Sequence, residues 1–321
     1  MASLGYPRDA RRQRRMAFVA TRMYLALRKP LSMDPDPLPF ELPHARLGLI
    51  NEIGAKLAGV RNVVGVVLGG SYARGTAKAT SDLDFGIYYA EGSPFDIARI
   101  REVAEEISSP GAPPTVTGFY AWGPWVNGGA WIVTAQGKVD FLYRNIPQIE
   151  RTIARASAGS YEHNYYQQPT FGFSSIVYLA ETQCCIPLAD PYGAIARLKT
   201  AVDCYPERLR QKVITKSLWL AEFTLMHAQG FAENGDVLNL AGCVARVCYF
   251  LLHTLFALNR AYYFGDKGAL EAVETFDRKP ADFAWRIRRI VSEPGDKPIN
   301  LIATIGLLRA VWLETRDLTG N

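Results

Sequence analysis

The spacing of apolar and polar residues changes along this chain and predicts where its helices and strands lie. Apolar residues recur at helical intervals in Leu47–Leu57 and Phe95–Ile107. Runs rich in β-branched and aromatic residues predict strands at Val63–Leu68, Leu83–Tyr89 and Thr115–Ala121. The first half of the chain therefore predicts a mixture of strands and helices.

Two further runs, Ala130–Ala135 and Lys138–Tyr143, are separated by Gln136-Gly137. A two-residue connection of this kind is typical of a tight β-hairpin turn. With these two residues at the turn, Val133 is predicted to face Asp140 across the hairpin.

The segment 157–170 is polar and rich in turn-forming residues, and the pattern after it is helical. Pro206 suits the first turn of a helix that reaches Ala228. Further helical patterns cover Leu238–Tyr263, Gly268–Phe276, Pro280–Val291 and Ile299–Leu318. We therefore predict an α+β protein in three parts: a basic leader and proline-rich linker at 1–39, a sheet-bearing domain at 40–156 and an all-α helical bundle at 157–321.

Composition narrows the class of protein. With 321 residues, 49% of them hydrophobic, the chain has a globular rather than a disordered composition. Its longest apolar stretch, Val237–Leu258, is interrupted by Asn239, Arg246 and His253, so we expect no membrane span. The five cysteines show no CxxC spacing, which argues against a disulfide framework or a zinc site. We expect a soluble, cytoplasmic protein.

The net charge of +5 is unevenly distributed. Eight of the 36 basic and one of the 31 acidic residues lie in residues 1–30, which leaves 28 basic and 30 acidic residues in the rest. A near-neutral body argues against nucleic acid as the partner. The leader fits a transit peptide, a membrane-surface contact or a nucleic-acid arm poorly. We interpret it as an unstructured tail or as translation from a start upstream of Met33.

One stretch carries the candidate chemistry. A predicted strand ends in Gly69-Gly70-Ser71, where the glycines let backbone amides approach a bulky anion and the serine adds a hydroxyl donor. Asp82 and Asp84 stand two apart on the next strand, so both carboxylates project from one face. Adjacent carboxylates need a cation between them to stay ionised, and Mg²⁺ binds both carboxylate and phosphate oxygens.

This arrangement resembles the nucleotidyltransferase superfamily that includes DNA polymerase β, and more closely its minimal and aminoglycoside (kanamycin) nucleotidyltransferase branches. The shared signature is an apolar strand ending in Gly-Gly-Ser, a gap of about ten residues, and Asp-x-Asp within a strand. The stretch Ala73-Arg74-Gly75-Thr76-Ala77 and Ser81 match a pattern common in the minimal branch. The resemblance implies a mixed sheet flanked by helices, a helical domain after it, and transfer of a nucleoside monophosphate with two Mg²⁺ ions.

The resemblance also implies a third carboxylate on a strand beside the first two. Asp140 is the candidate because it stands in an apolar run, where an unpaired acid is costly. It would ligate a metal, act as general base on the acceptor hydroxyl, or both. A salt bridge to Arg144 or a solvated strand face are the alternatives. Asp82, Asp84 and Asp140 are therefore the predicted catalytic and metal-binding residues.

Trp131 is predicted to face Leu142 in the hairpin and to lie diagonal to Asp140 on the same face. We expect it to wall an acceptor pocket, with help from Trp122 and Trp125. Core or hairpin-edge packing is the alternative for each of these rings.

Arg74 and Lys78 could reach a triphosphate from the loop, and Arg74 could equally pair with a carboxylate. The loop and strand-end residues that we predict to bind nucleotide are Gly69, Gly70, Ser71, Arg74, Lys78 and Ser81.

In the helical domain Asn239, Arg246, His253 and Arg260 recur every seven residues and predict one narrow stripe on a helix. We expect the stripe to face a cleft between the domains, with Arg246, Arg260 and Lys267 near the phosphates or the acceptor. Pairing with buried carboxylates from neighbouring helices is the alternative.

These patterns predict a nucleotidyltransferase that uses an NTP, with ATP expected, and a small-molecule hydroxyl acceptor. The resemblance suggests an acceptor of the aminoglycoside or lincosamide type. Two alternatives stay open: a nucleotidyltransferase that modifies protein or tRNA, as in toxin and antitoxin systems, and a catalytically silent nucleotide-binding regulator. We expect neither nucleic acid nor membrane as a partner, and a homodimer stays open.

Overall fold

The computed structural model describes residues 44–320, which divide into two compact units. The first unit contains the described residues up to Glu150 and a returning segment, Thr182–Ala201. The second contains Arg151–Glu181 and the chain from Val202 onward. The predicted leader, 1–39, lies outside the described residues.

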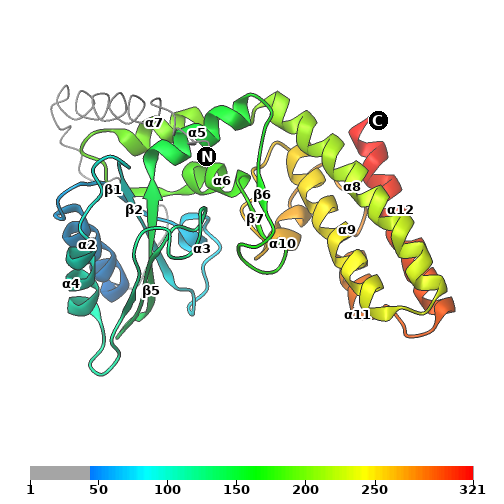
Figure 1. The fold of residues 1–321 in the computed structure, drawn as a ribbon, viewed down its shortest axis with the longest axis horizontal. Helices are drawn as coiled ribbons and strands as arrows, with labels where there is room; N and C mark the ends of the chain where they lie inside the picture. The colour runs from blue at the N-terminus through cyan, green and yellow to red at the C-terminus, as the bar shows by residue number, and fades with distance from the viewer. Residues whose placement is uncertain (1–43, 321) are drawn as a thin grey trace, which may run out of the picture. The chain divides into compact units, whose positions relative to one another are not determined.

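The first unit is built around a six-stranded mixed sheet in the order β3-β4-β5-β2-β1-β8 (Figure 1). Its parallel neighbours are β2 and β5, and the other neighbouring strands are antiparallel. The strands are β1 (Val63–Leu68), β2 (Leu83–Tyr89), β3 (Thr115–Val116), β4 (Gly129–Thr134), β5 (Gly137–Asn145) and β8 (Ile186–Ala189), and the helices are α2 (His44–Ala58), α3 (Gly70–Ala73), α4 (Ile97–Ile107) and α7 (Ala194–Ala201).

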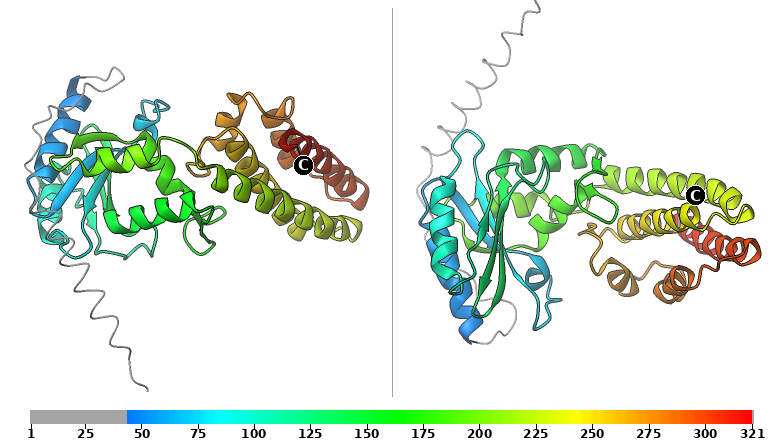
Figure 2. Two further views of the ribbon diagram at one scale, coloured as in Figure 1. Left: turned by 90° about the horizontal axis from the view of Figure 1, so that it is seen from above. Right: turned by 60° about the horizontal axis from the view of Figure 1, so that its bottom comes forward.

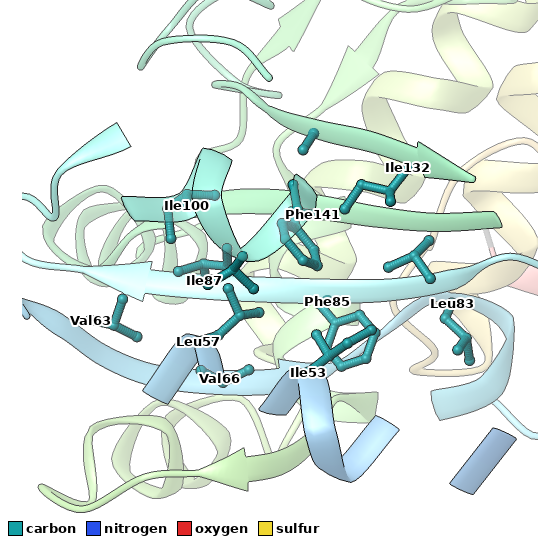
Figure 3. Packing of buried hydrophobic residues seen from close by; sticks show 14 of the residues in the cluster. Ile53, Leu57, Val63, Val66, Leu83, Phe85, Ile87, Ile100, Ile132 and Phe141 are labelled. Atoms are coloured by element: carbon teal, nitrogen blue, oxygen red, sulfur yellow. The ribbon is translucent and has the colours of Figure 1, made fainter. Parts of the chain in front are cut away.

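The core of this unit lies between the sheet and helices α2 and α4. Ile53 of α2 and Ile100 of α4 belong to the same buried cluster as Phe85 of β2 and Phe141 of β5 (Figure 3). The two phenylalanine rings meet edge to face, with centroids 6.0 Å apart. Burying each such ring contributes about 1.5–3 kcal/mol to folding. Because side chains alternate along a strand, the residues between these core positions point to the other face of the sheet.

The predicted strand Thr115–Ala121 is wrong beyond Val116. Tyr120 and Asn127 have positive φ angles, 60° and 66°, which are far from the extended backbone of a strand. The Asn127 side chain accepts a hydrogen bond from the Tyr120 N–H at 2.8 Å and so closes a loop in place of a strand. Of the apolar residues in this loop, Phe119 packs against the core, whereas Tyr120 and Ala121 are exposed.

The expectation that the chain is helical after residue 170 is wrong at β7 (Phe173–Ser174) and at β8, and β6 (His163–Asn164), which pairs with β7, lies within the predicted turn-rich segment 157–170. β8 pairs antiparallel with β1, which is buried at every position. A strand of four residues has too few positions to show a periodic pattern in the sequence. Pairing with a distant apolar strand therefore decides its conformation.

The second unit is helical, with α8 (Glu207–Glu233) and α9 (Val237–Leu258) forming a long hairpin and α12 (Pro298–Thr319) packed against both (Figure 2). The shorter α10 (Ala269–Glu274) and α11 (Phe283–Ser292) complete it, while α5 (Ile146–Ser157) and α6 (Ile176–Cys184) cross from one unit to the other along the chain. Among the described helices α9 alone has the length and composition of a membrane span, but 67% of its most apolar window is buried, as in a core helix.

Candidate active site

The glycine loop is fastened to the strand that carries Asp84. The Gly69 N–H donates a hydrogen bond to the Asp84 carbonyl oxygen at 2.8 Å. Gly70 has a φ of +60°, and a Cβ placed on it would lie 1.7 Å from Asp84 Oδ2. Glycine is therefore required at position 70 for its backbone angle and for the space that the carboxylate fills.

Asp140 stands beside Asp84. In the parallel pairing of β2 and β5 these two residues are in register, on strands about 4.8 Å apart. Both side chains are half-buried, and their chain neighbours on each strand are buried in the core. The sheet thus presents two carboxylates side by side on the face opposite the core, although Asp140 comes 56 positions after Asp84 in the sequence.

Asp82 directly precedes β2 and is half-buried. Within residues 44–320, no three or more His, Cys, Asp or Glu side chains stand close enough together to hold a metal ion by themselves. Mg²⁺ takes oxygen ligands and is usually held by one or two carboxylates together with substrate phosphates and water. The paired acids Asp84 and Asp140 suit that ion in the chemistry and number of their donors, whereas the structure does not group Asp82 with them, and its role as a third ligand stays a prediction.

The loop between the glycines and Asp82 folds on itself. The Thr76 N–H donates to the Ser71 carbonyl oxygen at 3.0 Å, and the Lys78 N–H donates to the Ser81 hydroxyl oxygen at 2.8 Å. Ser81 returns a bond from its own N–H to the Lys78 carbonyl at 2.9 Å. Ser81 thus has a visible structural role, and its predicted contact with nucleotide stays a prediction. The Lys78 side chain is exposed, whereas Arg74 is half-buried.

Arg46 of α2 is a residue that sequence reasoning missed. Its guanidinium donates to the carbonyl oxygens of Ala79 and Ser81, at 3.1 and 3.3 Å, and so holds the loop that leads to Asp82. It also donates to the Gln136 carbonyl at 3.1 Å in the hairpin turn before Asp140, and to the Tyr72 hydroxyl. One side chain thereby ties together three segments that surround the acids. A lone arginine in a helix gives no sequence signal for such a role.

The hairpin register differs from the prediction. Trp131 pairs directly with Asp140, and Val133 pairs with Lys138, because the turn is at Ala135 and Gln136. The Thr134 hydroxyl accepts the Gln136 N–H at 3.1 Å and donates to the Gly137 carbonyl at 2.8 Å, which fixes this turn. Trp131 still lies on the face of Asp140, as expected, but directly opposite it rather than diagonal to it.

Asn239, Arg246 and His253 lie at seven-residue intervals on α9, but the predicted stripe does not extend to Arg260, and its members differ in exposure. Asn239 and Arg246 are exposed, whereas His253 is only 3% exposed. Arg260 lies beyond the end of α9, has a φ of 54° and forms an ion pair with Glu207 at 3.2 Å. Glu207 is exposed, so this ion pair is not the pairing with a buried carboxylate that was the alternative for the stripe. Lys267 is exposed.

Two of the three histidines of this unit, His163 and His253, are held by packing and hydrogen bonds within it. The His253 ring lies against Tyr249 and Tyr263, with centroids 4.4 and 4.0 Å away, and its Nε2 is buried without a partner among the described residues. Burial lowers the pKa of His253 to about 3, so the ring is neutral at physiological pH. His163 is held by hydrogen bonds to the Tyr249 hydroxyl and the Phe171 carbonyl, at 2.9 and 2.6 Å, and burial lowers its pKa as well.

Comparison with known proteins gives two family matches. Residues 50–114 match the nucleotidyltransferase domain, and residues 177–267 match a domain of unknown function, DUF4037. No curated protein matches the chain. Among solved structures, a nucleotidyltransferase-like protein from Exiguobacterium sibiricum is similar at 10% identity and a TM-score of 0.42, over 84% of this chain and 76% of that one. The first matched segment contains Gly69, Gly70, Asp82 and Asp84, and it supports placing the sheet-bearing unit in the nucleotidyltransferase superfamily.

Proposed function

We propose that this protein transfers a nucleoside monophosphate from a nucleoside triphosphate, with ATP as the expected donor, to a hydroxyl group of a small molecule. The nucleotidyltransferase-domain match supports nucleotidyl transfer in general. The observation that carries the proposal is the contact between the Gly70 backbone and the Asp84 carboxylate, with Asp140 in register beside it. The glycine loop, for which we propose a role in binding phosphate, thus lies next to a pair of acids.

In the proposed reaction the acceptor oxygen attacks the α-phosphorus of the nucleotide. A new phosphorus–oxygen bond forms as the bond to the bridging oxygen breaks, and pyrophosphate leaves. Asp140 receives the proton of the acceptor hydroxyl and later passes it to solvent. Ser71 and the backbone amide of Gly70 hold the triphosphate, whereas the Gly69 N–H is already used in its bond to the Asp84 carbonyl oxygen.

Asp82, Asp84 and Asp140 would hold two Mg²⁺ ions in this proposal. When bound, these ions neutralise the charge that develops on the reacting oxygens and on the departing pyrophosphate. We propose Arg74, Lys78 and Ser81 as additional nucleotide contacts from the loop. Arg246, Arg260 and Lys267 of the helical unit are the remaining candidates, and the exposure of all three leaves them able to bind phosphate.

The class of acceptor rests on two arguments. The resemblance to aminoglycoside nucleotidyltransferases favours a small molecule of the aminoglycoside or lincosamide type, and the near-neutral charge of residues 31–321 argues against RNA. The rival functions are modification of protein or tRNA and nucleotide binding without catalysis. Retention of all three acids argues against the second rival. A cytoplasmic location fits a chain without a disulfide framework.

Incubation with radiolabelled ATP and Mg²⁺, against an aminoglycoside and lincosamide panel, bulk tRNA and cell lysate, tests this proposal. We expect label on a small molecule. The double variant Asp82→Asn/Asp84→Asn should abolish transfer while keeping the melting temperature, and Asp296→Asn, an exposed acid of the helical unit, serves as the matched control. Transfer that persists in the double variant would contradict the role assigned to these acids.

A further inference from the structure

We infer that Trp122 and Trp131 form a stacking platform that binds the ring of the acceptor beside Asp140. The inference rests on the proposed function and narrows its substrate to hydroxylated molecules that have a flat ring face. The two indoles are stacked, with centroids 4.7 Å apart and planes 17° apart, and Trp131 is 54% exposed. A large exposed aromatic side chain held rigid by a second one loses little entropy when a ligand ring stacks on it.

The backbone of β4 is shaped to seat Trp122. A Cβ on Gly129 would lie 1.7 Å from the Phe141 carbonyl oxygen and 3.1 Å from the Trp122 ring. The indole of Trp122 therefore lies close to the strand at a position where only glycine fits. This leaves Trp122 against the sheet and Trp131 facing outward.

The loop that delivers Trp122 is rigidly held. The Trp122 N–H donates a hydrogen bond to the Asn127 carbonyl oxygen at 2.7 Å. Asn127 is fully buried, and its side-chain amide donates to the Tyr89 hydroxyl oxygen at 2.8 Å. Tyr120 takes a left-handed backbone conformation, which costs about 1–2 kcal/mol in a residue with a Cβ. The surrounding bonds enforce this conformation, and unfavourable backbone angles of this kind are concentrated at ligand-binding sites.

The strand order assigns the platform to the acceptor rather than to the nucleotide. In the sheet order β4-β5-β2-β1, Trp131 is directly opposite Asp140 on one side, whereas the loop of Gly70 adjoins Asp84 on the other. A molecule that reaches Asp140 from the side of Trp131 therefore approaches the two acids from one side. The triphosphate, bound by the loop of Gly70, would lie on the other side. The next pair on this face consists of the apolar Val133 and the cationic Lys138. Because Lys138 repels other cations, this surface suits a neutral ring better than a polycation.

Ligand-observed NMR on the full chain tests the platform with 4-nitrophenyl β-D-glucopyranoside as the ring probe and sorbitol as an open-chain polyol. We expect the probe to bind and sorbitol not to bind. Trp131→Thr, which keeps strand propensity, should weaken probe binding about tenfold, because the variant loses the aromatic surface on which the ring stacks. Trp131→Phe should restore most of the affinity. Trp219→Ala, which removes a tryptophan with 58% exposure on α8, is the matched control and should change nothing.

Equal affinity of the wild type and Trp131→Thr for the probe would overturn the inference, as would sorbitol binding as tightly as the probe. In a further outcome, Trp131→Thr weakens the Mg²⁺-dependent binding of a non-hydrolysable ATP analogue and leaves probe binding unchanged. This result would assign the platform to the nucleobase and would also overturn the inference. The proposed function fails by a different result, namely no Mg²⁺-dependent binding of the analogue to the wild-type protein. Calorimetry with the analogue therefore separates the two failures.

Discussion

Each unit of this protein contains polar residues that the sequence predicted to lie together, and the two sets have different outcomes. In the sheet-bearing unit Asp84 and Asp140 are brought into register on adjacent strands, next to a glycine loop. In the helical unit Arg246 is exposed and stacks over Phe250 of its own helix, with 5.4 Å between the guanidinium carbon and the ring centroid. His253, seven residues later, is buried among tyrosines.

The difference arises from what surrounds each position. A strand in a sheet has the same neighbours on one face along its length, so a period of two keeps side chains in one environment. A helix of 22 residues passes different segments at each turn, and the tyrosine that covers His253 comes from the chain after α9. Equal spacing on a long helix therefore does not imply an equal environment.

Among the variants considered, we expect Gly70→Ala to have the largest effect, because it disrupts the packing of Gly70 against Asp84 in the sheet-bearing unit. The added methyl would displace the Asp84 carboxylate, and we expect transfer to fall by about 10²–10³-fold. Gly75→Ala is the matched control, because Gly75 also has a positive φ, +68°, but a Cβ there meets no atom within 4 Å. Initial rates of label transfer measure both. Equal losses in the two variants would mean that the backbone angle, and not the contact with Asp84, explains the requirement for glycine.

Arg46→Ala should have the next largest effect. Without its bonds to Ser81 and Gln136 the loop and the hairpin turn are no longer tied together, so we expect kcat to fall about 10- to 100-fold. Arg46→Lys should recover little, because an ammonium group cannot span these carbonyls as a guanidinium does. Arg61→Ala, at an exposed arginine of the same unit, is the control. A kcat unchanged in Arg46→Ala would show that the contacts are dispensable.

His253 should make the stability of the helical unit depend on pH. Its pKa of about 3 in the folded protein is below the ordinary value of 6.5, so the unfolded chain binds more protons between these pH values. Stability is therefore full above pH 6.5 and falls as the pH drops toward 3, by up to about 1.4 kcal/mol per pH unit. The free energy of unfolding, measured with urea between pH 7 and pH 5, should change less with pH in His253→Phe than in the wild type.

The control variant is His227→Gln, because His227 is exposed. Its free energy of unfolding should depend on pH as in the wild type. If the free energy of unfolding depends on pH equally in His253→Phe and in the wild type, protonation of His253 does not destabilise the folded protein.

The smallest effect is expected at the end of the predicted stripe. The ion pair of Arg260 with Glu207 is exposed to water, and surface pairs of this kind contribute little. Arg260→Ala should leave the melting temperature within about 1 °C of the wild type. A larger decrease would show that this pair stabilises the start of α8. A weaker affinity for the ATP analogue would instead support the proposed phosphate contact of Arg260.

Local sequence predicted β1 and β2 with the bounds that the structure shows, and it singled out the glycine loop with Asp82 and Asp84 as candidates for the site. These features depend on residues close together in the chain, where backbone preferences and side-chain alternation act directly. The hairpin was predicted with its turn one residue too far along, because the Thr134 hydroxyl rather than the glycine position decides which residues form the turn.

Tertiary structure alone decided the rest. It brought Asp140 next to Asp84, added β8 to the sheet edge beside β1, and gave Arg46 its contacts with three separate segments. It also dispersed the polar positions of α9 and of the residues after it into exposed and buried environments. Each of these outcomes depends on which distant segments pack together, and residue spacing along one helix or strand holds no information about its neighbours.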